Sequence, residues 1–111
     1  MELIDISHFH HCKIVTGVVL EATPFAEARK PAIKMVVDCG EFGIKKTSAQ
    51  ITAHYNPSNL VGRTVITLIN IPPRRIAGFD SECLVLGAVP SDAGVVLLNT
   101  DQNVPPGTPI A

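Results

Sequence analysis

The sequence is poor in the features that define membrane, secreted and disulfide-rich proteins. It has no apolar run near the ~20 residues that span a bilayer, so no membrane span is expected. The first residues lack the basic and apolar regions of a signal peptide, which predicts a cytoplasmic protein. Cys12, Cys39 and Cys83 are odd in number and far apart, which fits neither a disulfide framework nor a paired zinc spacing and predicts reduced thiols.

Motifs of catalysis are also missing. The chain has no GxSxG, no HExxH and no phosphate-binding glycine loop, and His54 is interpreted as a surface or capping residue. The segment "HFHHC" (8–12) offers enough ligands for adventitious Zn²⁺ or Ni²⁺, but a structural metal site usually draws on two separated ligand pairs. We therefore predict a protein that is not an enzyme and has no metal site and no cofactor.

What the sequence does contain is a series of short strands. Its 111 residues, 46% of them hydrophobic, predict a single domain over 1–111 with a core at about 12–100. Glycine or proline falls at nearly every junction between segments of strand character. These segments are 13–22, where Gly17 indicates a bulge or bend, 31–40, 42–50, 63–71, 81–89 and 94–100.

One segment breaks this pattern. Residues 49–62 predict short helical turns interrupted at Asn56-Pro57, with Ser58 as the expected cap of the second turn. A closed barrel is the economical arrangement for about six short strands because it removes unpaired strand edges. With one helical insert between strands three and four, the pattern predicts an all-β protein, specifically an OB-fold Greek-key barrel.

Charge is distributed unevenly along the chain. The formal net charge is −1, yet residues 29–75 carry eight basic residues against two acidic ones. The segments on either side are net acidic. This middle segment can form a local positive face, which indicates a polyanionic partner despite the neutral total.

The stretch "PPRR" (72–75) is the most informative part of this basic segment. Pro72 and Pro73 fix two φ angles, so the arginines that follow are held on a stiff corner. The guanidinium groups of Arg74 and Arg75 match phosphate oxygens bidentately. The corner therefore favours a phosphate contact.

Residues after the corner leave two interpretations open. Gly78 allows a positive φ or close backbone approach, and Ser81 supplies a small hydroxyl for phosphate or base. The alternative is an exposed loop in which the two arginines pair with Asp80 or Glu82.

A second basic cluster lies on the predicted strand 42–50. Alternation places Ile44, Lys46, Ser48 and Gln50 on one face and Lys45 on the other. The two lysines therefore cannot line one groove without a bulge, and a solvated edge strand explains them equally well.

Aromatic residues are few, with four phenylalanines, one tyrosine and no tryptophan. A non-specific single-strand binder stacks successive bases on several aromatics. Phe42 and Phe79 are candidates for stacking, although core packing is the commoner fate of such residues. The shortage favours contact with a nucleic-acid backbone or with structured RNA.

Four segments together carry a recognisable pattern: "AEARKPAIK" (26–34), "GIKKTSAQIT" (43–52), "LVGRTVITLINIPPRRIAGFDSECLVLGA" (60–88) and "VVLLNTDQNVPPGTPI" (95–110). They resemble the tRNA-binding domain of some methionyl-tRNA synthetase C-terminal extensions, which also occurs as free-standing dimers. Many members read Ser-x-Gly-Met after the arginines, whereas residues 81–84 read "SECL", which resembles the CsaA-like branch of small secretion chaperones.

The resemblance implies an OB-fold, a two-fold dimer built through the terminal segments, and RNA contact from the groove of the barrel. Its implied partner is tRNA; the alternative is a chaperone that binds unfolded or exported preproteins, with RNA binding weak or incidental. The family motif falls on Asn70, Pro73, Arg74 and Arg75, followed by Gly78 and Ser81. The predicted RNA-binding set is Asn70, Arg74, Arg75, Gly78, Ser81, Lys34, Lys46, Ser48 and Gln50.

Overall fold

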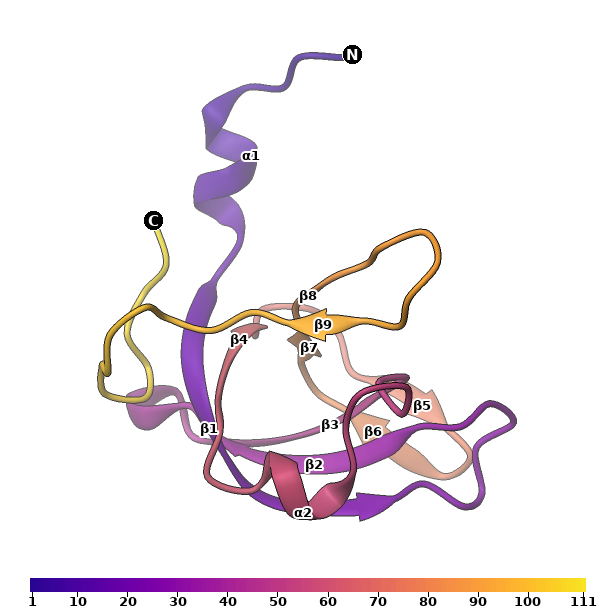
Figure 1. Cartoon of the computed structure of the whole chain (residues 1–111). Helices are drawn as coiled ribbons and strands as arrows, with labels where there is room; N and C mark the ends of the chain where they lie inside the picture. The colour runs from indigo at the N-terminus through magenta and orange to yellow at the C-terminus, as the bar shows by residue number, and fades with distance from the viewer.

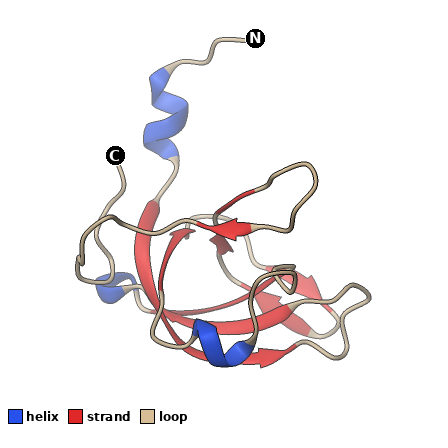
Figure 2. Ribbon diagram, viewed as in Figure 1, coloured by secondary structure: helices blue, strands red, loops and turns tan.

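Short antiparallel strands make up most of the regular structure in a computed structural model that describes residues 1–111 (Figures 1 and 2). The elements are α1 (Ile6–His11), β1 (Ile14–Pro24), β2 (Ile33–Asp38), the 3₁₀ turn η1 (Gly40–Phe42), β3 (Ile44–Ala49), α2 (Pro57–Leu60), β4 (Thr64–Leu68), β5 (Arg74–Ile76), β6 (Phe79–Ser81), β7 (Leu84–Val85), β8 (Gly87–Ala88) and β9 (Val96–Leu97). None of the helices has the length and apolar character needed to cross a membrane.

The main sheet has five strands in the order β3-β2-β1-β4-β7 and curls into a nearly closed barrel. Its two edges meet through Glu82, whose backbone N–H donates to the carbonyl of Lys46 at 2.7 Å. The backbone N–H of Lys46 in turn donates to Oε1 of Glu82 at 2.8 Å. The expected all-β OB-fold is confirmed, and α2 lies between β3 and β4 as predicted.

Alternation along β2 builds one side of the barrel core. Ile33, Met35 and Val37 are buried, while the residues between them are partly exposed, as the sequence pattern predicts. They pack with Val15, Val19, Cys39, Ile51, Leu60 and Val65 in a single apolar cluster. This cluster forms the apolar core of the barrel, and the few buried polar residues are three threonines and one serine: Thr16, Thr47, Thr67 and Ser81.

The long strand β1 bends at a different residue from the one predicted. The register with β2 shifts between Val19 and Glu21, so the bulge falls at Leu20 and not at Gly17. Gly17 serves close packing instead, because a Cβ there would lie 2.4 Å from Cγ1 of Val37. The prediction of a bulge or bend at Gly17 is therefore wrong, and the glycine is needed because the two strands approach closely there.

Three local features differ from the sequence-based expectations. The cap of α2 is Asn56, whose side chain accepts from the backbone N–H of Asn59, whereas Ser58 only donates to Asn56. The predicted strand 81–89 is divided among β6, β7 and β8. The corner after Pro73 continues into a hairpin, β5–β6, that the sequence analysis did not identify.

The two ends of the chain behave differently. Residues 107–110 cover the edge of β1, with Thr16 donating its N–H to the carbonyl of Thr108 at 2.9 Å and Ile110 donating to Ile14 at 2.9 Å. The N-terminal helix α1 was not predicted; it extends away from the barrel with no buried residue (Figure 1). A hydrogen bond from the backbone of Ser7 caps α1 and lowers the pKa of Asp5.

Candidate nucleic-acid interface

The adjacent arginines of the proline corner have different surroundings. Arg75 faces Asp80 across the β5–β6 hairpin, and its Nη1 donates to Oδ1 of Asp80 at 2.9 Å. This is the ion pair that the alternative interpretation predicted, and it is exposed, at 67% for Arg75 and 44% for Asp80. Arg74 forms no salt bridge and lines a large hollow on the outside of the barrel.

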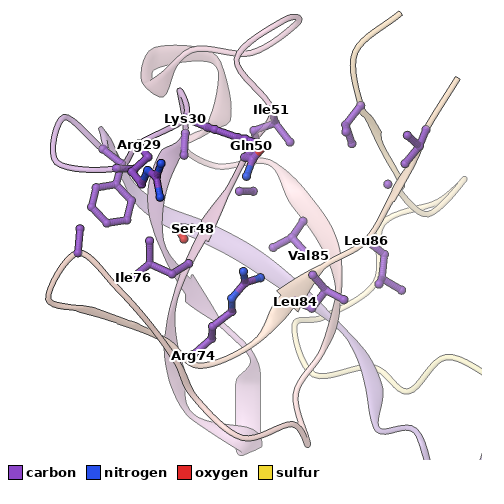
Figure 3. Close-up of a pocket in the computed structure, with 18 residues that line it drawn as sticks. Arg29, Lys30, Ser48, Gln50, Ile51, Arg74, Ile76, Leu84, Val85 and Leu86 are labelled. Atoms are coloured by element: carbon purple, nitrogen blue, oxygen red, sulfur yellow. The ribbon is translucent and has the colours of Figure 1, made fainter. Parts of the chain in front are cut away.

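We call this hollow the cationic groove; it has a volume of about 1130 Å³. Its charged lining residues are Arg29, Lys30 and Arg74, and no carboxylate lines it. Figure 3 shows Arg74 reaching into the groove, with Arg29 and Lys30 across from it. Three uncompensated cations around one concavity produce a positive potential that the net charge of the chain conceals.

The rest of the groove is mainly apolar. Ile51, Val85 and Leu86 line it together with Phe25, Ala28, Ala32, Ala49, Ile76, Ala77, Leu84, Gly87, Val89 and Val95. Ser48 and Gln50, at the end of β3, add neutral hydrogen-bonding groups. The groove therefore combines cations, which suit phosphate or carboxylate, with apolar surface, which suits ring faces or aliphatic side chains.

Segments far apart in sequence supply the cations. Arg29 and Lys30 lie in the connection between β1 and β2, whereas Arg74 begins β5. The structure thus brings Arg74, Ser48 and Gln50 of the predicted set to one place. It adds Arg29 and Lys30, which sequence analysis counted in the basic segment but did not select, because only the fold shows that this connection faces β5.

Lys34 and Lys46 gather at a smaller hollow of about 240 Å³, which we call the aromatic hollow. The β2–β3 register pairs Lys34 with Ser48 and Val36 with Lys46, so both lysines lie on the outer face of the sheet. Phe79 completes this site, and Glu21 is its only carboxylate. Phe79, a stacking candidate from the sequence for which core packing is the commoner expectation, is half-buried.

Three other predicted residues, Asn70, Ser81 and Gly78, stabilise the local backbone and line neither hollow. The side-chain amide of Asn70 accepts from the N–H of Lys13 and donates to the carbonyl of His11, each at 2.8 Å, and so fixes the start of β1. Ser81 is 8% exposed, and its Oγ accepts from the N–H of Ser48 at 3.2 Å. Gly78 has φ +80° in the two-residue turn of the β5–β6 hairpin and, as expected, adopts a positive φ.

The thiols and histidines stand apart from both hollows. The three cysteines are free, Cys12 being exposed and the other two buried. Burial raises the pKa of the Cys39 thiol to about 11 and also raises the pKa of Cys83. No group of three or more His, Cys, Asp or Glu side chains is arranged to hold a metal ion.

Comparison with known proteins identifies relatives of this domain. The family described as "Putative tRNA binding domain" matches residues 14–109. The methionine–tRNA ligase of Methanocaldococcus jannaschii is 33% identical over 99% of this chain, which corresponds to 17% of that enzyme. That of Methanosphaerula palustris is 36% identical over 98% of the chain and 16% of the enzyme. The chain therefore spans about a sixth of the length of these ligases.

Solved structures of small proteins match over their full length. The chaperone CsaA of Bacillus anthracis str. Ames is 44% identical, with a TM-score of 0.94, and the match covers 99% of this chain and 100% of that one. The CsaA chaperone protein of Picrophilus torridus is 42% identical, with a TM-score of 0.91, and the match covers 98% and 100%. A MetRS-related protein of Pyrococcus horikoshii is 27% identical, with a TM-score of 0.89 and complete coverage of both chains.

Proposed function

The chain belongs to the tRNA-binding domain family, and from this membership we propose that it is a non-catalytic, cytoplasmic protein that binds tRNA through the cationic groove. The observation that carries the proposal is the grouping of Arg29, Lys30 and Arg74 around one concavity with no carboxylate among them. Each cation that neutralises a phosphate releases counterions, which favours binding at low salt.

The groove also explains how a chain of net charge −1 binds a polyanion. Residues 76–111 carry four acidic residues, but none of them lines the groove. At physiological ionic strength the field of an exposed charge decays within about 8 Å, so cations lining the groove outweigh carboxylates elsewhere. Local charge, and not the total, decides whether a phosphate backbone is attracted.

We further propose that the functional unit is a homodimer formed through the N-terminal residues 1–11, which include α1. Met1, Leu3, Ile4 and Ile6 are exposed to between 66% and 116% of their reference area, although they are apolar. A segment with exposed apolar side chains that extends from the barrel with no buried residue needs a partner surface, and a second copy with two-fold symmetry provides one. Two grooves on one dimer would contact more phosphates of a single RNA than one groove does.

Salt titration of tRNA binding tests the groove assignment. We expect the double variant Arg29→Ala/Arg74→Ala to weaken binding of a tRNA transcript and to reduce the slope of log K against log salt by about 2. The matched control is Lys13→Ala/Lys45→Ala, which removes the same charge from positions that line neither hollow. Equal slopes for the two double variants, measured by fluorescence anisotropy, would refute the groove as the RNA site.

A second candidate function, binding of unfolded or exported preproteins, is favoured by the apolar lining of the same groove. Leu84, Val85 and Val89 offer aliphatic surface of the kind that holds extended apolar peptide segments. This candidate makes the groove a chaperone site and RNA binding an incidental property. The two candidates share a surface, so their ligands must compete.

Competition between ligands separates the two candidates. An unfolded protein, reduced and carboxymethylated, should displace labelled tRNA if the cationic groove binds both ligands. Variant Val85→Ser removes apolar surface without changing charge, so we expect it to weaken peptide binding and leave tRNA affinity within about twofold. Binding of the peptide together with no binding of tRNA at low salt would favour the chaperone function and reject the primary proposal.

A further inference from the structure

One phenylalanine ring, that of Phe79, lines the aromatic hollow, and the ring of Phe25 packs against it. Phe25 and Phe79 meet edge to face, with centroids 5.4 Å apart and planes at 66°. Phe25 lines the cationic groove and Phe79 lines the aromatic hollow, so this ring pair separates the two concavities. Phe25 is 4% exposed and Phe79 is half-buried, so Phe79 supplies the accessible ring.

Two lysine ammonium groups stand over these rings. Nζ of Lys34 lies 5.2 Å from the centroid of Phe25 and 5.5 Å from that of Phe79. Nζ of Lys46 lies 5.5 Å from the centroid of Phe79. Neither lysine forms a salt bridge. A cation held over a ring near the surface is held weakly, so both side chains can move aside and turn to an incoming anion.

Size limits what the aromatic hollow can accept. Its volume of about 240 Å³ is below the roughly 300 Å³ at which pockets for drug-sized molecules begin. One planar ring fits, but a larger molecule has to extend past the lysines. Along the outer face Lys34 lies opposite Ser48, which lines the cationic groove, so a chain that leaves the hollow continues toward that groove.

We propose that the aromatic hollow binds one unpaired base of an RNA, stacked on Phe79, while Lys34 and Lys46 contact the phosphates on either side of it. This inference rests on the proposed RNA binding and adds to it a preference for RNA that contains an unpaired base. An unpaired nucleotide brings both a π face and two flanking phosphates, which match the ring and the two ammonium groups. A peptide aromatic side chain would fill the hollow but would bring no anion to either lysine, and Glu21 is the only carboxylate that lines the hollow.

The test uses two RNA hairpins that differ by one bulged 2-aminopurine, a base whose fluorescence is quenched by stacking. The wild type should quench the bulged base and bind the bulged hairpin about 5- to 100-fold more tightly than the plain one. Variant Phe79→Leu keeps apolar packing against Phe25 and should abolish both the quenching and the preference. Phe79→Trp should retain both.

Variants of the lysines and of the groove separate this inference from the proposed function. Lys34→Gln should weaken binding of the bulged hairpin more than that of the plain one. Arg74→Ala should weaken both hairpins equally and leave their ratio unchanged. Lys34→Gln keeps the test decisive if Phe79→Leu fails to fold.

Two results would overturn the inference while RNA binding stands: equal affinity of the wild type for the two hairpins, or a preference that survives both Phe79→Leu and Lys34→Gln. If the wild type binds neither hairpin and no tRNA, the proposed function fails and this inference fails with it.

Discussion

Arg75 donates a hydrogen bond to Asp80 across the β5–β6 hairpin, with 2.9 Å between Nη1 and Oδ1. The pair holds one of the two guanidinium groups of the corner in a local contact, whereas Arg74 lines the cationic groove. An exposed pair of this kind contributes about 0.2–1 kcal/mol to stability, so its main effect is on which arginine is available to a ligand.

Releasing Arg75 should therefore increase RNA binding. We expect Asp80→Asn to raise affinity for a tRNA transcript about two- to fivefold and to steepen the salt slope by up to about 1, because one more guanidinium becomes free to contact a phosphate. Asp92→Asn, an exposed change of the same charge in the β8–β9 loop, is the control. If both variants gain tRNA affinity equally, the change in net charge explains the effect and the ion pair does not restrain Arg75.

Single substitutions at the corner should have unequal effects. Arg74→Ala removes a cation that lines the groove, so we expect about five- to tenfold weaker tRNA binding and a salt slope lower by about 1. Arg75→Ala removes a group already paired with Asp80 and should change affinity by less than about twofold. Anisotropy titrations at two salt concentrations distinguish the variants, and a larger loss for Arg75→Ala would reverse the assignment.

Light scattering at micromolar concentration checks the dimer. The wild type should have twice the 11.8 kDa mass of one chain. Phe9→Asp places a charge on the same side of α1 as Ile6, and we expect it to give a monomer with an unchanged barrel by circular dichroism. Ser7→Asp adds the same charge on the roughly opposite side of α1 and should remain dimeric. A monomeric wild type would contradict the proposed assembly.

Burial of Cys39 predicts a loss of stability at alkaline pH. The folded pKa is raised from 9.0 to about 11, so between these values the unfolded chain loses the proton while the folded chain keeps it. The free energy of unfolding contributed by this group is intact below about pH 9. It falls by up to about 1.4 kcal/mol per pH unit as pH rises toward 11. Tm measured from pH 8 to 11 should fall less steeply in Cys39→Ala than in the wild type, and parallel curves would exclude this thiol as the cause.

Gly17 should tolerate no side chain unless its neighbour is shortened. A Cβ at this position would lie 2.4 Å from Cγ1 of Val37 and 3.3 Å from the carbonyl oxygen of Asp38. We expect Gly17→Ala to lower the free energy of unfolding by about 1–3 kcal/mol, measured by urea denaturation. In Gly17→Ala/Val37→Ala the combined loss should be smaller than the sum of the single losses, because the second change removes the clashing methyl group. Strict additivity would show that the two positions do not compete for space.

The strands and the helical insert of the barrel were predictable where they depend on residues that are close together in the sequence. Ile33, Met35 and Val37 alternate with partly exposed residues, so their strand and its buried face follow from the sequence. The helical insert follows from the break at Asn56-Pro57, although the cap of α2 is Asn56 and not the predicted Ser58. The division of residues 81–89 into three short strands could not be predicted from the sequence. Their backbone hydrogen bonds go in turn to β5, β3, β4 and β9, and these partners are set by the tertiary fold.

The candidate site was predictable only in part for the same reason. Arg74 was found because two prolines and two arginines adjoin in sequence. Arg29 and Lys30 acquire a role only when the β1–β2 connection folds beside β5, and no local signal carries that proximity. Asp80 was named as a partner of the arginines, but the hairpin register decides that it pairs with Arg75 and leaves Arg74 free.

The edge of β1 that is covered by residues 107–110 makes barrel closure depend on segments that are distant in the sequence. Ile14 and Thr16 belong to the first strand of the barrel, yet the groups that satisfy them belong to Thr108 and Ile110. Thr16 and Thr108 are 92 positions apart in the chain. A contact of such long sequence separation requires closure of a long loop and forms slowly, so we expect this edge of β1 to be covered in one of the last steps of folding.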